Sequence, residues 1–214
     1  MALLGLAMAF CSLLIVANIM AVKLVSVGPF VVPVAVVAYP FTFLVTDTIS
    51  EIFGRRVATR VIWLGFAMNI LVVLLIYLGK IVPPASFWEG QQAYETILGS
   101  VPRIVLASMV AYLASQHHDV IAFHFWRRLT KGRFLWLRNN ASTVVSQGVD
   151  TVLFIPIAFA GQVPTNTLLS MMAGQYIIKL VIAVFDTPLC YALVWLLKRR
   201  GSADTLTPAH APFE

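Results

Sequence analysis

Six long apolar stretches divide the chain and leave little else for it to fold with. They cover roughly residues 3–24, 31–50, 59–80, 103–123, 141–161 and 168–197. A helix needs about 20 mostly apolar residues to cross the hydrocarbon core of a bilayer, and each stretch reaches that length. Backbone N–H and C=O groups find no water partners in lipid, so spans of this kind are helical.

The composition excludes the other common classes of protein. Only 11% of the 214 residues are charged and 60% are hydrophobic, whereas a soluble domain carries about 25% charged residues. So few charges cannot cover a water-exposed surface, which excludes a soluble globular domain, a disordered chain and a coiled coil. We expect an all-α integral membrane protein with six transmembrane helices. We expect residues 1–200 to form one six-helix transmembrane domain and residues 201–214 a short polar cytoplasmic tail.

The basic residues predict which side of the membrane each loop faces. Eleven of the fifteen lysine and arginine residues lie in alternate connections or after the last stretch: Arg55, Arg56, Arg60, Arg127, Arg128, Lys131, Arg133, Arg138, Lys198, Arg199 and Arg200. Cytoplasmic loops are enriched in these residues, so both termini are predicted to be cytoplasmic and residues 81–102 and 162–167 to face outward. Topology and contact with lipid explain the net charge of +6, and nucleic acid binding is not needed.

Polar side chains within the apolar stretches are costly in lipid and are therefore functional candidates. Helical spacing places those from Asn139 to Asp150 on one stripe, and Gln175, Lys179 and Asp186 on one face. We expect these faces to line a protein interior or a water-filled cavity. The candidates for substrate binding are Asn18, Lys23, Asp47, Gln116, Asn140, Gln147, Asp150, Gln175, Lys179 and Asp186, and those for proton coupling are Glu51 and Asp119.

Several candidates have a structural alternative. Asn18 could equally hold helices together through amide hydrogen bonds, and Lys23 could extend to the membrane interface. Lys179 lies too deep in the sixth stretch to do so, and it is predicted to pair with an aspartate. Asp150, near the midplane of the fifth stretch, is the leading functional candidate.

Other local patterns are less specific. Short Asp-Thr repeats suggest an inverted repeat that places Asp47 opposite Asp150. Pro40 is predicted to kink the second helix, because its ring removes a backbone hydrogen bond. His117 and His118 have no further ligands at metal-binding spacing, so neither a metal site nor a cofactor is predicted.

A series of motifs runs from about residue 15 to residue 200. They are Asn-Ile-Met-Ala-Val-Lys at 18–23, Tyr-Pro at 39–40, Thr-Asp-Thr-Ile-Ser-Glu-Ile-Phe-Gly at 46–54, Ser-Gln-x-x-Asp at 115–119, Leu-Arg-Asn-Asn-x-Ser-Thr at 137–143, Ser-Gln-x-x-Asp-Thr at 146–151 and Asp-Thr-Pro at 186–188. Together they resemble the queuosine-precursor transporter family, earlier described as vitamin uptake transporters (the VUT family). The resemblance implies a six-helix importer of the bacterial inner membrane, similar in fold to the substrate-binding subunits of energy-coupling-factor transporters.

The resemblance also implies the substrates, which are 7-cyano-7-deazaguanine, 7-aminomethyl-7-deazaguanine or queuine, imported by a secondary or facilitated mechanism. A guanine-like edge offers two adjacent donors, which a carboxylate such as Asp47, Asp150 or Asp186 can accept together. Gln147, Asn140 and Lys179 are candidate donors to its carbonyl oxygen. The candidates for stacking on the flat ring are Phe154, Tyr176 and Phe185.

Two other functions stay open. The chain could be a substrate-binding subunit that needs a separate ATPase module. It could also be an intramembrane enzyme, although paired catalytic aspartates must share one site and the sequence does not show that proximity. A homodimer is one arrangement open to a small importer.

Overall fold

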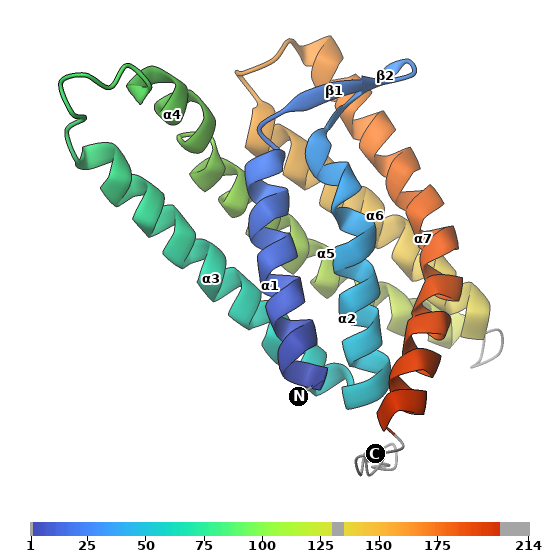
Figure 1. Ribbon diagram of the computed structural model, residues 1–214. Helices are drawn as coiled ribbons and strands as arrows, with labels where there is room; N and C mark the ends of the chain where they lie inside the picture. Colours follow the sequence, from blue (N-terminus) through green and yellow to red (C-terminus); the bar gives the residue numbers. More distant parts are fainter. Residues whose placement is uncertain (1, 130–134, 202–214) are drawn as a thin grey trace.

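A computed structural model of the chain describes residues 2–129 and 135–201, most of which are helical (Figure 1). The long helices are α1 (Ala2–Met20), α2 (Tyr39–Phe53), α3 (Arg55–Ile81), α5 (Val101–Leu129), α6 (Leu135–Phe159) and α7 (Thr165–Gly201). The shorter elements are helix α4 (Gln91–Leu98), the 3-10 turn η1 (Val34–Val37) and strands β1 (Leu24–Val27) and β2 (Phe30–Pro33). The prediction of a mainly helical chain is confirmed.

Three stretches of the described residues are long and apolar enough to cross a membrane. They are Ala2–Met20, Arg55–Ile81 and Gln91–Ser115, and the last of these runs through α4 into α5. Helix α6 adds a shorter apolar stretch, Val144–Phe159. Length and composition of the described helices therefore support three membrane-spanning helices, and a total of six remains a prediction.

The segment between α1 and α2 corrects the prediction of an all-α chain and of a helical span over residues 31–50. Strands β1 and β2 pair antiparallel, with Val27 opposite Phe30, around a two-residue turn in which Gly28 has φ 58°. A short apolar run does not by itself distinguish a strand from a helix. Pro33 is the last residue of β2. Proline has no N–H and would break a hydrogen bond inside a helix, but here it lies outside one.

Helix α2 begins at Tyr39, later than predicted, and Pro40 lies in its first turn and does not kink it. Pro40 occupies one of the first two positions of α2, where a helix needs no N–H donor. The helix ends at Phe53, and Gly54, with φ 85°, turns the chain directly into α3. The fifteen residues of α2 span about 22 Å, which is less than the hydrocarbon thickness of a bilayer.

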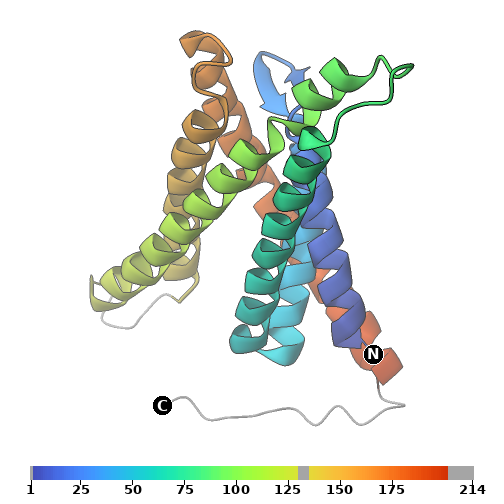
Figure 2. The same cartoon turned by 90° about the vertical axis from the view of Figure 1, so that its left-hand side faces the viewer.

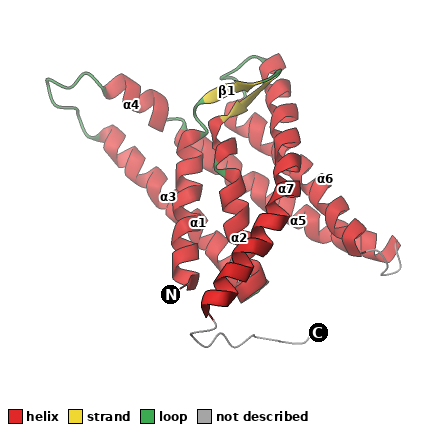
Figure 3. Cartoon of the chain, turned by 45° about the vertical axis from the view of Figure 1, so that its right-hand side comes forward, coloured by secondary structure: helices red, strands yellow, loops and turns green. Residues whose placement is uncertain are grey.

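The β-hairpin packs on the first turns of α7 at one end of the bundle, the hairpin end (Figure 3). The Val31 N–H donates to Ser170 Oγ at 3.2 Å. Gly174 allows this approach, because a β-carbon there would lie 2.6 Å from Phe30 Cβ. The N-terminus and the α2–α3 connection lie at the opposite end (Figure 1).

The long helices form two groups, which meet through α7 and where α5 packs against α1 and α3 (Figure 2). Helices α5 and α6 make the most extensive helix pair, whereas α1, α2 and α3 pack against one another. Small residues, including Ala17, Ala107 and Ala158, are buried in the core that α1, α5 and α6 share, since small side chains let membrane helices approach closely. Helix α7 contacts both α2 and α6, so its side chains reach both groups.

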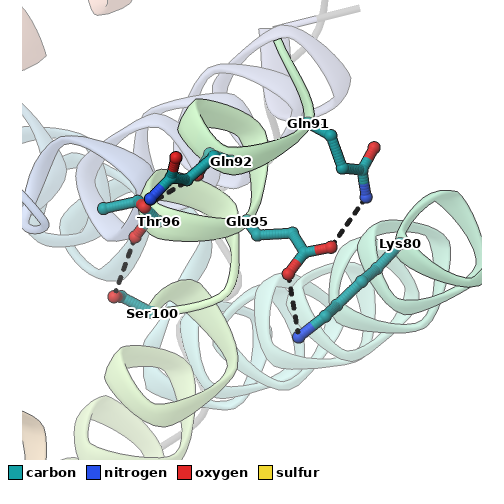
Figure 4. A network of polar contacts seen from close by, with 6 residues as sticks. All are labelled: Lys80, Gln91, Gln92, Glu95, Thr96 and Ser100. Carbon is teal, nitrogen blue, oxygen red and sulfur yellow. Dashed lines mark hydrogen bonds and ion pairs between the residues drawn. The ribbon is translucent and has the colours of Figure 1, made fainter. Parts of the chain in front are cut away.

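The connection from α3 to α5, predicted as an outward loop, contains helix α4. Glu95 of α4 accepts a hydrogen bond from Gln91 at 2.7 Å and lies 3.8 Å from Lys80 Nζ at the end of α3 (Figure 4). Both charged side chains are largely exposed to solvent, so the ion pair contributes little to stability. The contacts show that α4 lies beside the end of α3.

Candidate functional site

An ion pair within the helix bundle joins α6 and α7. Lys179 of α7 donates through Nζ to Asp150 Oδ2 of α6. The lysine side chain is 4% exposed and the aspartate side chain 22%. The prediction that Lys179 pairs with an aspartate is confirmed, and the pairing offsets the cost of removing each charge from water.

Tyr39 brings a third helix to the ion pair. It is the first residue of α2, and Lys179 Nζ lies 5.4 Å from the centroid of its ring. An ammonium group within about 6 Å of an aromatic ring face is attracted by the ring quadrupole. Tyr39 is not among the site candidates predicted from the sequence, and the Tyr-Pro pair that opens α2 is the signal that could have found it.

Gln175 lies one helical turn before Lys179 on α7, on the same face. It is 1% exposed, and neither Nε2 nor Oε1 has a hydrogen-bond partner among the described residues. Leaving a polar group buried and unpaired costs about 1–3 kcal/mol. A ligand that offers one donor and one acceptor would satisfy this amide, so Gln175 is a strong candidate for ligand contact.

Two polar side chains beside Asp150 have partners within the protein. Thr151 Oγ1 donates to the Gln147 carbonyl at 2.8 Å. Ser146, one turn before Asp150, lies with its Oγ 3.2 Å from His118 Nδ1 of α5. Ser146 and Asp150 of the polar stripe predicted on α6 therefore face α5 and α7, as expected for a protein interior.

Two of the aromatic residues predicted to stack on a ligand have packing contacts. Phe154 is buried and meets Phe159 edge to face, with ring centroids 6.2 Å apart. The Tyr176 hydroxyl donates to the Val144 carbonyl at 3.2 Å. The side chain of Phe185 lies outside the described residues. Tyr39 is the ring that the structure places against the ion pair.

Asn18 contacts another helix and not the ion pair. Its Nδ2 donates to Asn69 Oδ1 of α3 at 2.7 Å, and Asn69 Nδ2 donates to the Gly65 carbonyl at 2.9 Å. Both amides are buried, which matches the structural alternative given for Asn18. Lys23 is exposed just after α1.

The remaining predicted residues divide into exposed and undescribed ones. Asp47 and Glu51 lie one turn apart on α2, and both are exposed. The side chains of Gln116, Asp119, Asn140 and Asp186 lie outside the described residues. Within the described part of the chain, no group of three or more His, Cys, Asp or Glu could hold a metal ion.

Apolar helices around an ion pair and an unsatisfied amide define a helical membrane protein with a polar site in its interior. The chain belongs to the family described as "Putative vitamin uptake transporter", whose model matches residues 33–193. This range includes Tyr39, Asp150, Gln175 and Lys179.

Similar proteins carry consistent names. The "Probable queuosine precursor transporter" of Bacillus subtilis (strain 168) is 35% identical over 177 residues, which cover 82% of this chain and 77% of that protein. The "Queuosine precursor transporter" of Escherichia coli (strain K12) is 37% identical over 122 residues, 57% of this chain and 52% of that protein. The chain thus spans about half the length of the second relative. No solved structure matches the chain.

Proposed function

We propose that this protein imports queuosine precursors, which are 7-deazaguanine bases, across the bacterial inner membrane by a secondary or facilitated mechanism. Family membership and the names of the relatives support the substrate class. The observation that carries the proposal is the unsatisfied Gln175 amide one turn from the Lys179–Asp150 pair. A small flat base needs only a few such polar groups to define its orientation.

The hydrogen-bonding groups of a 7-deazaguanine suit these side chains. Its N1–H and exocyclic amine are adjacent donors, and we assign them to the Asp150 carboxylate, which can accept both. Lys179 then donates to the carbonyl oxygen beside N1. The Gln175 amide has a donor and an acceptor, which suit N3 and N9–H on another edge of the base. The Tyr39 ring offers an aromatic face to the flat ligand.

The position of α7 supports a transport mechanism in which the two helix groups move relative to each other. Helix α7 contacts α2 in one group and α6 in the other, and it carries Gln175 and Lys179. Many transporters alternate access by rocking one bundle against another around a fixed site. We propose that α5 and α6 move relative to α1, α2 and α3, so that the site opens to each side in turn.

The proposed topology has six crossings and cytoplasmic termini. Arg55 and Arg56 begin α3 and are exposed, and the start of α3 lies at the same end of the bundle as the N-terminus (Figure 1). Basic residues favour the cytoplasmic side. The hairpin end then faces outward.

Thermal unfolding of the purified protein tests the substrate class. A ligand that binds the folded state raises the unfolding temperature, so 7-cyano-7-deazaguanine should raise it and adenine, which lacks the same donor edge, should not. The absence of a shift with every 7-deazaguanine would contradict the proposal. Uptake into vesicles with and without a proton gradient then separates the secondary mechanism from the facilitated one.

A further inference from the structure

Among the described side chains, the Lys179–Asp150 pair gives the candidate site one positive and one negative charge, which balance. We propose that this pair selects ligands by charge, so that the site prefers an uncharged flat base to one that carries an ammonium group. The inference rests on the proposed function, because it concerns the choice among bases that would enter the same site.

The burial of Lys179 is the first reason. Its side chain is 4% exposed, so water screens its charge poorly, and its contacts are the Asp150 carboxylate and the Tyr39 ring. In the proposed orientation Lys179 donates to the carbonyl oxygen, and the 7-substituent of the base lies beside that oxygen. An ammonium group on this substituent would therefore approach a second positive charge that is already buried, which is strongly unfavourable. An uncharged base can donate N–H groups to the same carboxylate without adding a second positive charge.

The positions of the other acids are the second reason. Among the described side chains of α2, Asp47 and Glu51 are exposed. On α7, the backbone of Asp186 lies about 10 Å further along the helix axis than that of Lys179, at a rise of roughly 1.5 Å per residue. Asp150 is thus the carboxylate, within the described part of the site, that a cationic ligand would have to share with Lys179.

A pair of ligands that differ in charge but hardly in shape tests the inference. The amine of 7-aminomethyl-7-deazaguanine is protonated at neutral pH, whereas 7-hydroxymethyl-7-deazaguanine is uncharged and nearly isosteric. Wild-type protein should bind the hydroxymethyl base more tightly, by roughly tenfold or more, given the strength of a single buried charge at an effective dielectric constant of about 20. Affinities are measured by calorimetry on the purified protein.

Substitutions of Lys179 assign the preference to its charge. Lys179→Gln removes the charge and should reduce or reverse the preference, whereas Lys179→Arg keeps the charge and should preserve it. If Lys179→Gln does not fold, Lys179→Met is used in its place. Equal affinities in the wild type, or a preference that Lys179→Gln leaves unchanged, would overturn the inference while the proposed function stands. Failure of the wild type to bind either base would instead contradict the proposed function.

Discussion

Lys179 of α7 donates to the Asp150 carboxylate of α6. Only 4% of the lysine side chain and 22% of the aspartate side chain are exposed. Removing two charges from water is costly, and the mutual attraction of a buried pair often does no more than balance that cost. An apolar pair of similar size would serve packing equally well. The charges are therefore better explained by a ligand than by stability.

Breaking this ion pair on one side should destabilise the protein. We expect Lys179→Met to lower the free energy of unfolding by about 2–3 kcal/mol, somewhat below the loss for a fully buried pair, because Asp150 keeps some contact with solvent. The double variant Lys179→Met, Asp150→Leu should recover most of that loss. Denaturant unfolding in detergent measures all three proteins, and additive losses in the double variant would show that the two residues do not interact.

Gln175 should show a conflict between stability and binding. Because both polar atoms of its amide are buried and have no partner among the described residues, Gln175→Leu should raise the free energy of unfolding of the ligand-free protein by about 1 kcal/mol. The same variant should lose most of the thermal shift caused by 7-cyano-7-deazaguanine. Gln162→Leu, the same change in an exposed turn, is the control and should retain the shift. A destabilised Gln175→Leu protein that keeps its ligand shift would exclude the proposed role.

Arg103 should stabilise the end of α6. Its Nε donates to the Ile157 carbonyl at 2.6 Å and its Nη2 to the Ala160 carbonyl at 2.7 Å. These carbonyls lie at a helix C-terminus, where they have no helical partners and attract positive charge. A lysine cannot reproduce the forked geometry, so Arg103→Lys should cost about 1–2 kcal/mol in thermal unfolding. Arg60→Lys, at an exposed position, should change stability little.

Labelling of single cysteines in intact cells tests the proposed orientation. In a background without Cys11 and Cys190, a cysteine that replaces Gln162 should react with a membrane-impermeant maleimide. A cysteine that replaces Arg56 should react only after the cells are opened, because basic residues favour the cytoplasmic side. The reverse pattern would show that the hairpin end faces the cytoplasm.

The sequence predicted the ion pair because a lysine deep in an apolar stretch has few ways to be tolerated. Lys179 could not reach the interface, so an acidic partner followed from the cost of its burial. The sequence also placed Gln175 on the same helical face as Lys179. It did not reveal that the Gln175 amide has no partner in the described part of the chain, since that depends on which side chains the neighbouring helices bring close.

The hairpin and Tyr39 escaped prediction for a related reason. The apolar residues from Val31 to Val37 fit the start of a membrane helix as well as a strand, and hydrophobicity does not separate the two. With the hairpin in place, α2 begins at Tyr39 with Pro40 in its first turn, and the Tyr39 ring lies against Lys179. Likewise, the sequence allowed Asn18 either a ligand-binding or a structural role. Its contact with Asn69 depends on how α1 and α3 pack together.

The affinity of Asp150→Asn for 7-cyano-7-deazaguanine tests most directly whether Asp150 binds the base. An amide keeps the size of the side chain but replaces one of the two acceptors by a donor, so we expect the dissociation constant to rise by about tenfold or more, in line with the strength of charge-assisted hydrogen bonds. Glu95→Gln, the corresponding carboxylate-to-amide change on α4, where Glu95 contacts Lys80 and Gln91 and not the ion pair, should bind as tightly as the wild type. An unchanged dissociation constant in folded Asp150→Asn protein would contradict the proposed site.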